Sequence, residues 1–599
     1  MPRTFTRKFS YRFAHPVATV WPALADTARF NEAAGFPKHR IEERPQADGS
    51  IRLFAKGRIG RVELAWEEFP VEWVWGQWFW HWREFSKGPI RTLGAMVTFD
   101  SVAGGCVCHY EIGATPANGL GHLVLRTGFF RRAERDFLRL CDQVAEWAKG
   151  VTPEPYSVPA HVPSAVDRQR IDAMIADMDR SDYGHGLGAR LVEWVLSAQE
   201  VDVVRIRPLQ MARRLSAGRR ETVEAMLQAV RSGLLQQRWD LLCPRCRGAK
   251  LSVDSMERLP DRAHCSACNV DYDRDFGRNV ELSFTPAPAL RPVYDGEYCL
   301  GGPMTTPHVL VQVRLEPGAE RDWPGRLPAG PFRYRTLDAG PWAEVMLDTD
   351  GSVPTLEIDA ESVDAGAPVP PGTLRFVNRD IRSRIGVIER RDWAADALTA
   401  QAVTTYQAFR DLCGGERLRP GDGAAISQVT LMFTDLRASS ALYRRIGDAP
   451  AFGQVREHFI YLARQVRRHD GAVVKTMGDA VLAAFADPAD AVAAALGIQR
   501  GMAGFNSRTG ADLSLKIGIH AGSCLAVTLN GRLDYFGHMV NLAARLQNQA
   551  DSGEIVVSDR VRSDPGAAPL LDPLSPERGA AVLHGMTEPE VFWRIRPGD

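Results

Sequence analysis

The sequence lacks an excess of either charge and lacks any long apolar run. Its 599 residues include 73 Lys and Arg and 73 Asp and Glu, so the net charge is zero. A balanced charge gives no general attraction to nucleic acid or to an anionic membrane surface. The most apolar run, 480–497, contains Asp487, Pro488 and Asp490, and it falls short of the roughly 20 apolar residues that a spanning helix requires. We therefore expect no membrane span and no nucleic-acid partner.

Two further absences bear on the compartment. Residues 1–13 contain Arg and Lys but neither the apolar core nor the cleavage site of a secretory signal. Ten cysteines in a chain of this length do not form a disulfide framework in a reducing compartment. We therefore expect a cytoplasmic protein.

The length predicts several domains, because a single core seldom serves more than roughly 150–250 residues. We expect a multidomain α+β protein with a proline-rich linker at 153–163. The expected units are an N-terminal domain at 1–150, a helical region at 164–240, a zinc ribbon at 241–280, a β-rich domain at 281–390, a coupling helix and linker at 391–421, and a C-terminal domain at 425–597.

The N-terminal domain combines aromatic-rich strands with a closing helix at about 130–149. A curved sheet wrapped on that helix fits the order of elements. This order and a tryptophan cluster between Trp66 and Trp82 resemble the START-like superfamily, a helix-grip fold, and the resemblance implies a cavity for an apolar ligand. The alternative is that the tryptophans are core and edge packing only.

Four cysteines form two CxxC pairs. Each CxxC turn presents two thiolates to one point, and two such turns complete a tetrahedron, so the spacing predicts a structural Zn²⁺ site. A closed set of four thiolates leaves no position for a reactive water. The predicted ligands are Cys243, Cys246, Cys265 and Cys268.

The segments between the zinc ribbon and the C-terminal domain carry no catalytic pattern. Turn residues divide 281–390 into short strands, which favours a small β-sandwich. Residues 392–412 are expected to be helical, with an apolar stripe from Leu398 to Leu412. Because this helix and the break up to Gly421 directly precede the C-terminal domain, we expect them to couple it to the preceding domains.

The first of three informative runs in the C-terminal domain is an apolar strand at 429–435 that ends in Asp435. A helix is expected from about Ser440 to Ile446. A carboxylate at a strand end beside a helix N-terminus can hold a cation while free backbone amides face phosphates.

The second run, 471–485, has two strands around a tight turn that contains Gly478 and Asp479. If this hairpin pairs beside the first strand, Asp479 comes near Asp435, and the two carboxylates can share divalent ions. Gly-Asp is also common at hairpin tips, so a purely structural turn is the alternative.

The third run follows a strand at 513–520 that we expect small residues at 521–523 to end. Asn541 and Arg545 are four residues apart in the helix that comes next, so they share one helix face. An amide and a long cation in this arrangement suit a ribose and a phosphate, and a solvated helix face is the alternative.

Taken together, the three runs resemble the class III nucleotidyl cyclase family over roughly the last 170 residues. The matching segments are 433–436, 475–479, 534–537 and 540–545. The resemblance implies a ferredoxin-like core and makes Asp435 and Asp479 the ligands of two Mg²⁺ or Mn²⁺ ions.

The same resemblance places Lys475 and Asp534 at the purine-reading positions. A lysine donor and an aspartate acceptor complement the edge of adenine, whereas an aspartate repels O6 of guanine, so ATP is the expected substrate. Asn541 is expected to orient the ribose, and Arg545 to stabilise charge on the phosphates in the transition state. Because family members combine metal ligands of one subunit with the other positions of its partner, a head-to-tail homodimer with two composite sites is implied.

Two departures from the family pattern stand out. Residues 438–440 replace a glycine and an aromatic-threonine pair that many members have after the first metal ligand, and His584 and Met586 stand near the place of a late phosphate-binding lysine. Lower turnover or a changed metal preference would follow.

The predicted function is an adenylate cyclase that converts ATP to cyclic AMP and pyrophosphate and is regulated by its N-terminal domains. The alternative is a nucleotide-binding sensor whose cyclase-like domain does not turn over. A third interpretation makes the zinc ribbon a nucleic-acid module, but acidic residues at 254, 261, 271 and 273 offset Arg245, Arg247 and Lys250.

Overall fold

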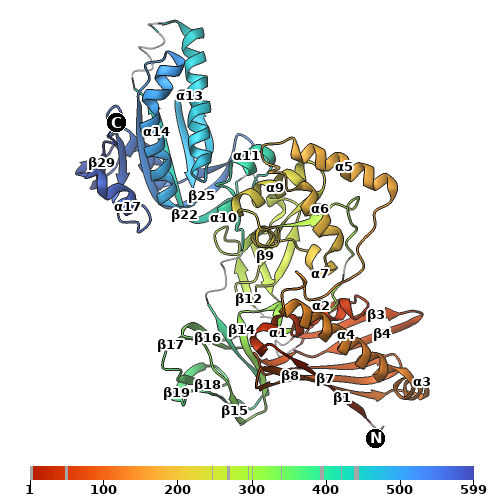
Figure 1. The fold of residues 1–599 in the computed structure, drawn as a ribbon. Helices are drawn as coiled ribbons and strands as arrows, with labels where there is room; N and C mark the ends of the chain where they lie inside the picture. The colour runs from red at the N-terminus through yellow and green to blue at the C-terminus, as the bar shows by residue number, and fades with distance from the viewer. Residues whose placement is uncertain are drawn as a thin grey trace.

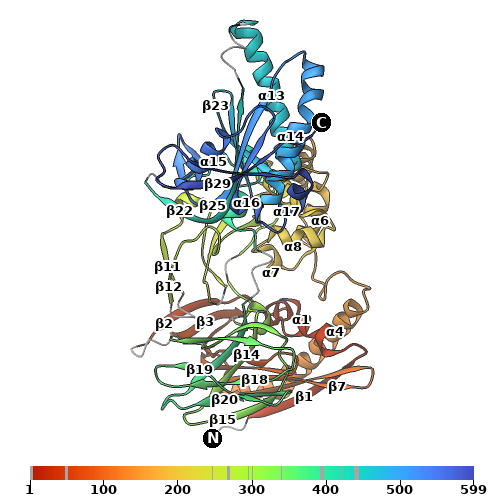
Figure 2. The same ribbon diagram turned by 90° about the vertical axis from the view of Figure 1, so that its left-hand side faces the viewer.

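The computed structural model describes residues 4–46, 51–245, 247–265, 270–294, 296–299, 301–338, 340–391, 397–419, 421–437, 444 and 446–598. The C-terminal domain lies at one end of an elongated molecule, and the N-terminal unit and a β-sandwich lie side by side at the other (Figure 1). A middle unit of helices and a small sheet separates the two ends, as the turned view also shows (Figure 2).

The N-terminal unit is a curved antiparallel sheet packed on a long helix. Strand β1 (Phe5–Phe13) pairs with β8, and the order β1-β8-β7-β6-β5 follows. Helix α4 (Phe130–Ala148) buries residues at helical spacing, among them Phe137, Leu140 and Val144, against this sheet. The other elements are α1 (Val17–Leu24), α2 (Thr27–Ala33), β2 (Arg40–Pro45), β3 (Ile51–Ile59), β4 (Val62–Glu68), β5 (Glu72–Val74), β6 (Trp78–Lys87), β7 (Ile90–Val102), β8 (Gly105–Pro116) and α3 (Gly119–Val124).

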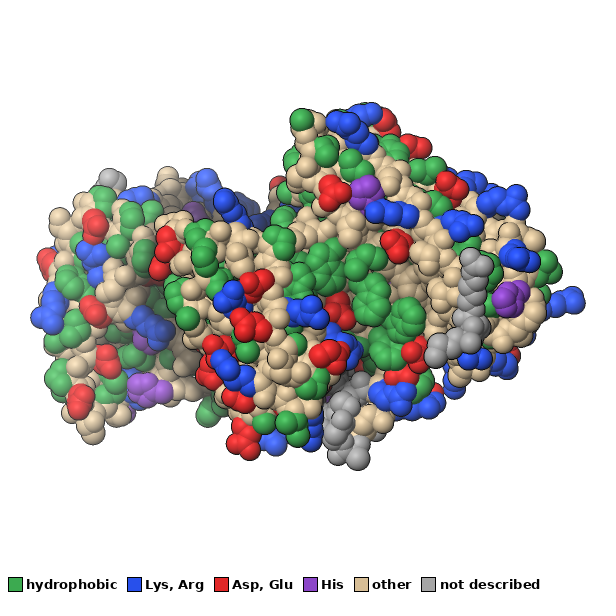
Figure 3. All heavy atoms as spheres, turned by 90° about the horizontal axis from the view of Figure 1, so that it is seen from below, with side chains coloured by type: hydrophobic (Ala, Val, Ile, Leu, Met, Phe, Trp, Pro, Cys, Tyr) green, Lys and Arg blue, Asp and Glu red, His purple; other side chains and the backbone are tan. Residues whose placement is uncertain are grey.

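The predicted tryptophan cluster serves packing. Trp66 and Trp73 are buried, whereas Trp80 and Trp82 stack on each other, half-buried, on the outer face of the sheet. Gly94 lies directly under the ring of Trp82, where a Cβ would meet the indole at 2.7 Å. Seen from the N-terminal end, hydrophobic side chains gather in a hollow near the middle of the molecular face (Figure 3).

The β-rich segment continues the N-terminal sheet. Strand β14 (Val309–Leu315) pairs with β5 through Val311 and Val74, so segments far apart in sequence form one sheet. A second sheet packs against this extension, and the two enclose one apolar core. The strands are β21 (Arg384–Arg390), β16 (Gly330–Thr336) and β17 (Trp342–Leu347) in the first sheet, and β15 (Glu320–Pro324), β20 (Thr373–Asn378), β18 (Val353–Ile358) and β19 (Val363–Val369) in the second.

The middle unit places helices on a three-stranded sheet of order β10-β9-β13. Helix α9 (Arg219–Arg231) is buried along most of its length, from Thr222 to Ala229. The other elements are α5 (Ala165–Asp179), α6 (Gly188–Ser197), α7 (Glu200–Val203), α8 (Pro208–Arg214), β9 (Leu235–Leu242), β10 (Ala249–Val253), β13 (Val280–Pro286) and a hairpin of β11 (Arg262–Cys265) with β12 (Val270–Asp273).

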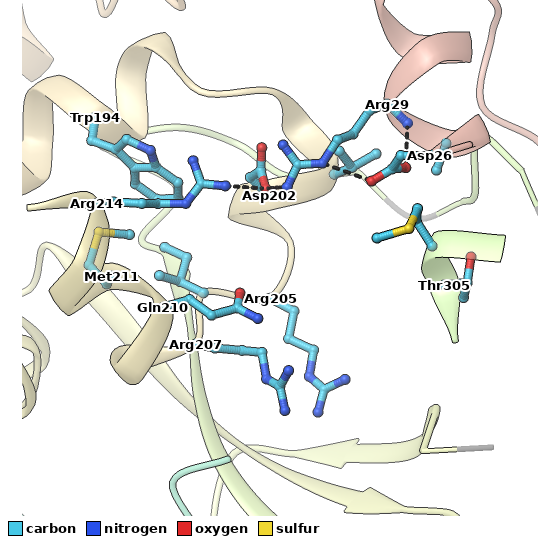
Figure 4. A pocket seen from close by; sticks show the side chains of 14 residues that line it. Asp26, Arg29, Trp194, Asp202, Arg205, Arg207, Gln210, Met211, Arg214 and Thr305 are labelled. Atoms are coloured by element: carbon cyan, nitrogen blue, oxygen red, sulfur yellow. Dashed lines mark hydrogen bonds and ion pairs between the residues drawn. The ribbon is translucent and has the colours of Figure 1, made fainter. Parts of the chain in front are cut away.

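An ionic cluster joins the middle unit to the N-terminal unit (Figure 4). Arg29 of α2 pairs with Asp26 at 2.9 Å and also with Asp202 of α7. Arg214 of α8 reaches the same carboxylate at 3.3 Å. Burial raises the pKa of Asp202 to about 6, with the negative charges of Asp26 and Glu32 adding to the effect and Arg29 opposing it.

The expected coupling helix is interrupted. Residues 392–396 lie outside the described part of the chain, and the remainder forms two short helices, α10 (Ala400–Val403) and α11 (Gln407–Leu412). Between them the hydroxyl groups of Thr404 and Thr405 donate to the carbonyls of Gln401 and Ala402. These local bonds replace the backbone bonds that would continue the helix.

The C-terminal domain has a sheet of order β23-β24-β22-β25-β27-β29-β28, with β26 paired to β25. Helices α13 (Asp448–Arg468) and α14 (Pro488–Thr509) cover one face and bury Met432, Val481 and Phe485 of the sheet. The expected helix at 440–446 falls mostly outside the described residues. The strands and further helices are β22 (Gly423–Leu436), β23 (Gly471–Met477), β24 (Ala480–Phe485), β25 (Leu515–Leu529), β26 (Arg532–Phe536), α15 (His538–Gln547), β27 (Ile555–Ser558), α16 (Asp559–Arg562), α17 (Ala568–Leu571), β28 (Glu577–Val582) and β29 (Pro589–Ile595).

The small residues at 521–523 do not end their strand, contrary to expectation, because β25 runs through them to Leu529. Two glycines of β25 instead let helix α15 approach the sheet. At Gly518 a Cβ would lie 2.2 Å from the backbone nitrogen of Gln547, and at Gly522 it would lie 3.3 Å from Met539 Cβ. Direct packing of α15 on β25 therefore requires glycine at Gly518.

No helix in the described ranges is long and apolar enough to cross a membrane.

Candidate active site

Asp435 is the next-to-last residue of β22, in the sheet of the C-terminal domain. It pairs in register with Lys516 of β25, and Phe433, two residues earlier, pairs with Leu482 of β24. Partial burial raises the pKa of Asp435, and the negative charge of Asp479 raises it further, whereas Lys516 opposes the shift. The two carboxylates are therefore close enough to interact electrostatically.

Asp479 occupies the two-residue turn between β23 and β24. Gly478 before it has a φ of 66°, the left-handed conformation that tight hairpin turns require and that glycine adopts without strain. Within the described residues the Oδ2 atom of Asp479 is buried and has no hydrogen-bond partner. A buried carboxylate oxygen without a partner is costly, and a hard divalent cation would satisfy it.

Lys475 shares the sheet face of Asp435. It pairs with Leu482, which pairs with Phe433, and directly paired residues present their side chains on one face. Asp435 is two residues from Phe433 and so lies on the same face. This face is opposite to the one that α13 and α14 cover.

Asp534 of β26 meets Lys475 directly. The Nζ of Lys475 lies 2.5 Å from Oδ2 of Asp534, and the side chains are 37% and 9% exposed. The other oxygen of Asp534 accepts a 2.8 Å hydrogen bond from the backbone N–H of Tyr535. The Lys475 ammonium and the Asp534 carboxylate therefore stand side by side in the fold.

Asn541 and Arg545 lie on α15, as predicted. Asn541 is exposed and Arg545 is half-buried. The guanidinium of Arg545 reaches the chain at Gly585, where a Cβ would lie 3.2 Å from its Nη2 atom. The segment with His584 and Met586, which lacks the late lysine of many family members, therefore lies next to Arg545, the predicted phosphate contact.

The middle unit contacts this same face of the sheet. One continuous apolar core contains Trp239 of the middle unit, Val403 and Phe409 of the connecting helices α10 and α11, and Leu482 and Ala484 of the sheet of the C-terminal domain. The side-chain oxygen of Gln407 accepts a 2.7 Å hydrogen bond from Val473 N, two residues before Lys475.

Two more contacts of the connecting helices reach the neighbours of Asp534. Arg410 donates to the carbonyl of Leu533 at 3.1 Å, and the hydroxyl groups of Thr404 and Tyr535 lie 2.9 Å apart. The connecting helices therefore contact residues close to Lys475 and to Asp534, the two predicted purine-reading residues.

Sequence reasoning missed His458. This histidine lies on the buried stripe of α13, and within the described ranges neither ring nitrogen has a partner. Burial lowers its pKa to about 4, while the charge of Asp479 opposes the shift. Its spacing from Val455 and Leu462, three and four residues away, was the available signal, because a histidine there must face the core.

The predicted zinc ligands are only partly described. Cys243 and Cys265 are buried, and the Sγ of Cys243 accepts a 3.3 Å hydrogen bond from Arg245 N. Cys246 and Cys268 lie outside the described residues. Over the part of the chain that is described, no group of three or more His, Cys, Asp or Glu is placed to hold a metal ion.

The C-terminal domain is similar to the catalytic domains of adenylate and guanylate cyclases. Residues 423–564 match the family described as the adenylate and guanylate cyclase catalytic domain. Residues 180–297, which include most of the middle unit, match a family of unknown function.

Several curated proteins are similar to this region. An adenylate cyclase of Mycosarcoma maydis is 32% identical over 177 residues, which are 26% of this chain and 7% of that protein. A pH-sensitive adenylate cyclase of Mycobacterium tuberculosis is 31% identical over 200 residues, 32% of this chain and 48% of that protein. The match thus spans less than half of these relatives. Among solved structures, an adenylyl cyclase from P. aeruginosa aligns with 18% identity and a TM-score of 0.26, over 30% of this chain and 97% of that one.

Proposed function

We propose that this chain is an adenylate cyclase that converts ATP to cyclic AMP and pyrophosphate. The observation that carries the proposal is the arrangement in the C-terminal domain, where the charge of Asp479 acts on Asp435 and where Lys475, on the same sheet face as Asp435, is ion-paired with Asp534. Adenylate cyclases of a fungus and a mycobacterium are similar to the domain that bears this face.

Asp435 and Asp479 are the proposed ligands of two Mg²⁺ or Mn²⁺ ions. The donor set fits hard cations, because both groups are carboxylates, one has an unsatisfied buried oxygen, and their mutual repulsion favours an added positive charge. Such ions would lower the pKa of the ribose 3′-hydroxyl and neutralise the triphosphate.

The remaining residues position ATP. Lys475 would donate to a ring nitrogen of adenine, and Asp534 would accept from the N6 amino group. Asn541 would orient the ribose for in-line attack on the α-phosphorus. Arg545 would stabilise the charge that develops on the phosphate oxygens.

The proposed enzyme is a homodimer, since in this class the metal ligands of one subunit complete the base pocket of the other. The middle unit is the proposed regulator, because the helices that connect it to the catalytic domain contact the neighbours of both Lys475 and Asp534. A small shift of these helices would move the base pocket.

A structural Zn²⁺ on the four cysteines remains part of the proposal. The backbone N–H of Arg245 that donates to the Cys243 sulfur supports it, because such outer-shell bonds orient metal ligands. Metal analysis of the purified protein should give one zinc per chain, lost in a Cys265→Ser variant. The proposed cyclase activity does not depend on the predicted apolar ligand of the N-terminal unit.

Product analysis tests the function directly. Purified protein is incubated with ATP or GTP, each with Mg²⁺ or Mn²⁺, and cyclic nucleotides are separated from pyrophosphate and unreacted substrate. Cyclic AMP should form from ATP with at least one metal and should be absent with Asp435→Ala. Binding of ATP without any cyclic product from the wild type would favour the alternative of a sensor without turnover.

A further inference from the structure

A cleft of about 250 Å³ lies between the N-terminal unit and the middle unit (Figure 4). Its wall comes from three stretches of the chain: residues 26, 28 and 29 at the start of α2, residues between 194 and 214 of the middle unit, and Met304 with Thr305 on the segment that leads to the β-sandwich. None of these lining residues belongs to the C-terminal domain. A molecule bound in the cleft would therefore contact both units at once, away from the candidate active site.

Two arginines of the cleft wall are held from behind by buried carboxylates. Glu281 is ion-paired with Nη2 of Arg205 and, at 2.7 Å, with Nε of Arg207. Asp240 lies 2.6 Å from Nε of Arg205. Both carboxylates are buried, and neither of them lines the cleft.

The same two arginines keep hydrogen-bond donors for a ligand. Figure 4 shows their guanidinium groups side by side. Within the described residues, Nη1 of Arg205 and both Nη atoms of Arg207 have no hydrogen bond or ion pair. Because Glu281 fixes both groups, these N–H donors are positioned before any ligand arrives.

Another part of the cleft wall is apolar. The guanidinium carbon of Arg214 lies 5.3 Å from the ring centroid of Trp194, so the aliphatic stem and the indole form one continuous surface. The other apolar lining residues are Val201, Ile206, Met211 and Met304. The hydrocarbon part of a small molecule would be buried on this surface.

The charges in the wall limit the charge of a ligand. Arg29 and Arg214 share the carboxylate of Asp202, and Arg29 also pairs with Asp26 at 2.9 Å. Both carboxylates line the cleft. The cleft therefore has no surplus of positive charge. One negative charge would be held by the free N–H donors, whereas a second would be repelled by the two carboxylates.

We propose that this cleft binds a small organic molecule with a single negative charge, a carboxylate or a phosphodiester, on the guanidinium groups of Arg205 and Arg207. A planar guanidinium matches the oxygens of either group, and the apolar wall receives the rest of the molecule. A neutral analogue lacks the charge-assisted hydrogen bonds. The proposal does not depend on the proposed cyclase activity.

Calorimetric titration of the full chain with four ligands of related shape tests the proposal, at pH 7.5 with a chelator and without nucleotide. Naphthoate and methyl naphthyl phosphate carry one negative charge, naphthyl phosphate carries nearly two, and naphthamide is neutral. At least one monoanion should bind about tenfold more tightly than naphthamide, as hydrogen bonds to charged groups imply. Naphthyl phosphate should not bind more tightly than the better monoanion. The identity of the better monoanion separates a carboxylate ligand from a phosphodiester ligand.

Two variants locate the binding. Arg207→Gln removes free donors and leaves Arg205 on Glu281, so the advantage of the monoanion over naphthamide should fall to about threefold or less. The exposed Arg170→Gln on α5 is the matched control and should keep the full advantage. Asp202→Asn removes a negative charge from the wall, so naphthyl phosphate should gain more affinity than methyl naphthyl phosphate.

Four results would overturn the proposal: no binding of either monoanion, equal affinity for naphthamide, tighter binding of naphthyl phosphate than of both monoanions by the wild type, or an undiminished monoanion advantage in Arg207→Gln. An unchanged ratio of the affinities for the two phosphates in Asp202→Asn would contradict the assignment of the site to this cleft.

Discussion

Thr404 and Tyr535 join their hydroxyl groups in a buried 2.9 Å hydrogen bond. Thr404 precedes the catalytic domain in the chain, and Tyr535 follows Asp534 directly. The bond therefore links the connecting helices to the strand that carries a predicted purine-reading residue, and it gives the proposed regulation a specific contact.

Removal of this link should loosen the base pocket. In Tyr535→Phe the lost hydrogen bond is worth about 1 kcal/mol, so we expect the KM for ATP to rise a few-fold while kcat changes little. Steady-state kinetics with ATP measure both. Tyr461→Phe is the control, because that hydroxyl donates to Ile498 O on the opposite face of the sheet; an equal effect of both variants would point to general destabilisation.

The proposed metal ligands, Asp435 and Asp479, repel each other when no cation is bound. Asp435→Asn removes one charge from the pair, so in a chelator the melting temperature of the catalytic domain should equal or exceed that of the wild type. With Mn²⁺ the wild type should gain thermal stability through binding to the folded state, and the variant should not. Thermal melts with and without Mn²⁺ measure this, with the exposed Glu457→Gln as control. A Mn²⁺ gain retained in Asp435→Asn would remove Asp435 from the metal site.

The proposed recognition of adenine depends on the pair of Lys475 and Asp534. Lys475→Glu brings two carboxylates together and removes the donor, so kcat/KM for ATP should fall by about 100-fold, which corresponds to 2–3 kcal/mol. Measurement of kcat/KM for ATP and for GTP shows whether the variant uses GTP better, and ATP less well, than the wild type. Unchanged ATP kinetics would refute the assignment of this residue.

The interface between the N-terminal and middle units should respond to pH through Asp202. Its pKa of about 6 in the folded protein exceeds the value near 3.9 of an unfolded aspartate. The folded state therefore binds a proton that the unfolded state releases between about pH 4 and 6, and this contribution to stability is lost as pH rises through 6.

The neutral variant Asp202→Asn should consequently be more stable than the wild type at pH 7.5, by on the order of 2 kcal/mol, and the difference should vanish near pH 4.5. Thermal or denaturant unfolding at a series of pH values gives the two curves, and the exposed Asp172→Asn provides a comparison. Parallel curves for Asp202→Asn and the wild type would show that the carboxylate titrates alike in the folded and unfolded states.

Local patterns in the sequence predict much of the candidate site. The strand that carries Asp435 near its end, the Gly478–Asp479 turn and the helix face of Asn541 and Arg545 each follow from periodicity and turn chemistry over a few residues. β22 pairs with β24, the strand that follows the turn with Asp479, so Asp435 and the hairpin belong to neighbouring strands of one sheet.

Long-range relationships were not accessible in the same way. The pairing of Val74 with Val311 joins strands more than 200 residues apart, and no local pattern encodes such a partner. The packing of α10 and α11 on the sheet of the C-terminal domain was also not predictable. The apolar stripe that includes Phe409 predicts that one helix face is buried, but it does not indicate which surface covers that face. The break at Thr404 arose from side-chain hydrogen bonds that compete with the helix.

The central claim is that two subunits complete each catalytic site across their interface, and mixing two inactive variants tests it most directly. Asp435→Ala lacks a metal ligand, and Arg545→Ala lacks the phosphate contact, so each homodimer should be inactive. Random reassociation gives half heterodimers with one intact site each, so the mixture should recover about a quarter of wild-type cyclic AMP production. A mixture no more active than either variant alone, with dimers formed, would contradict the account.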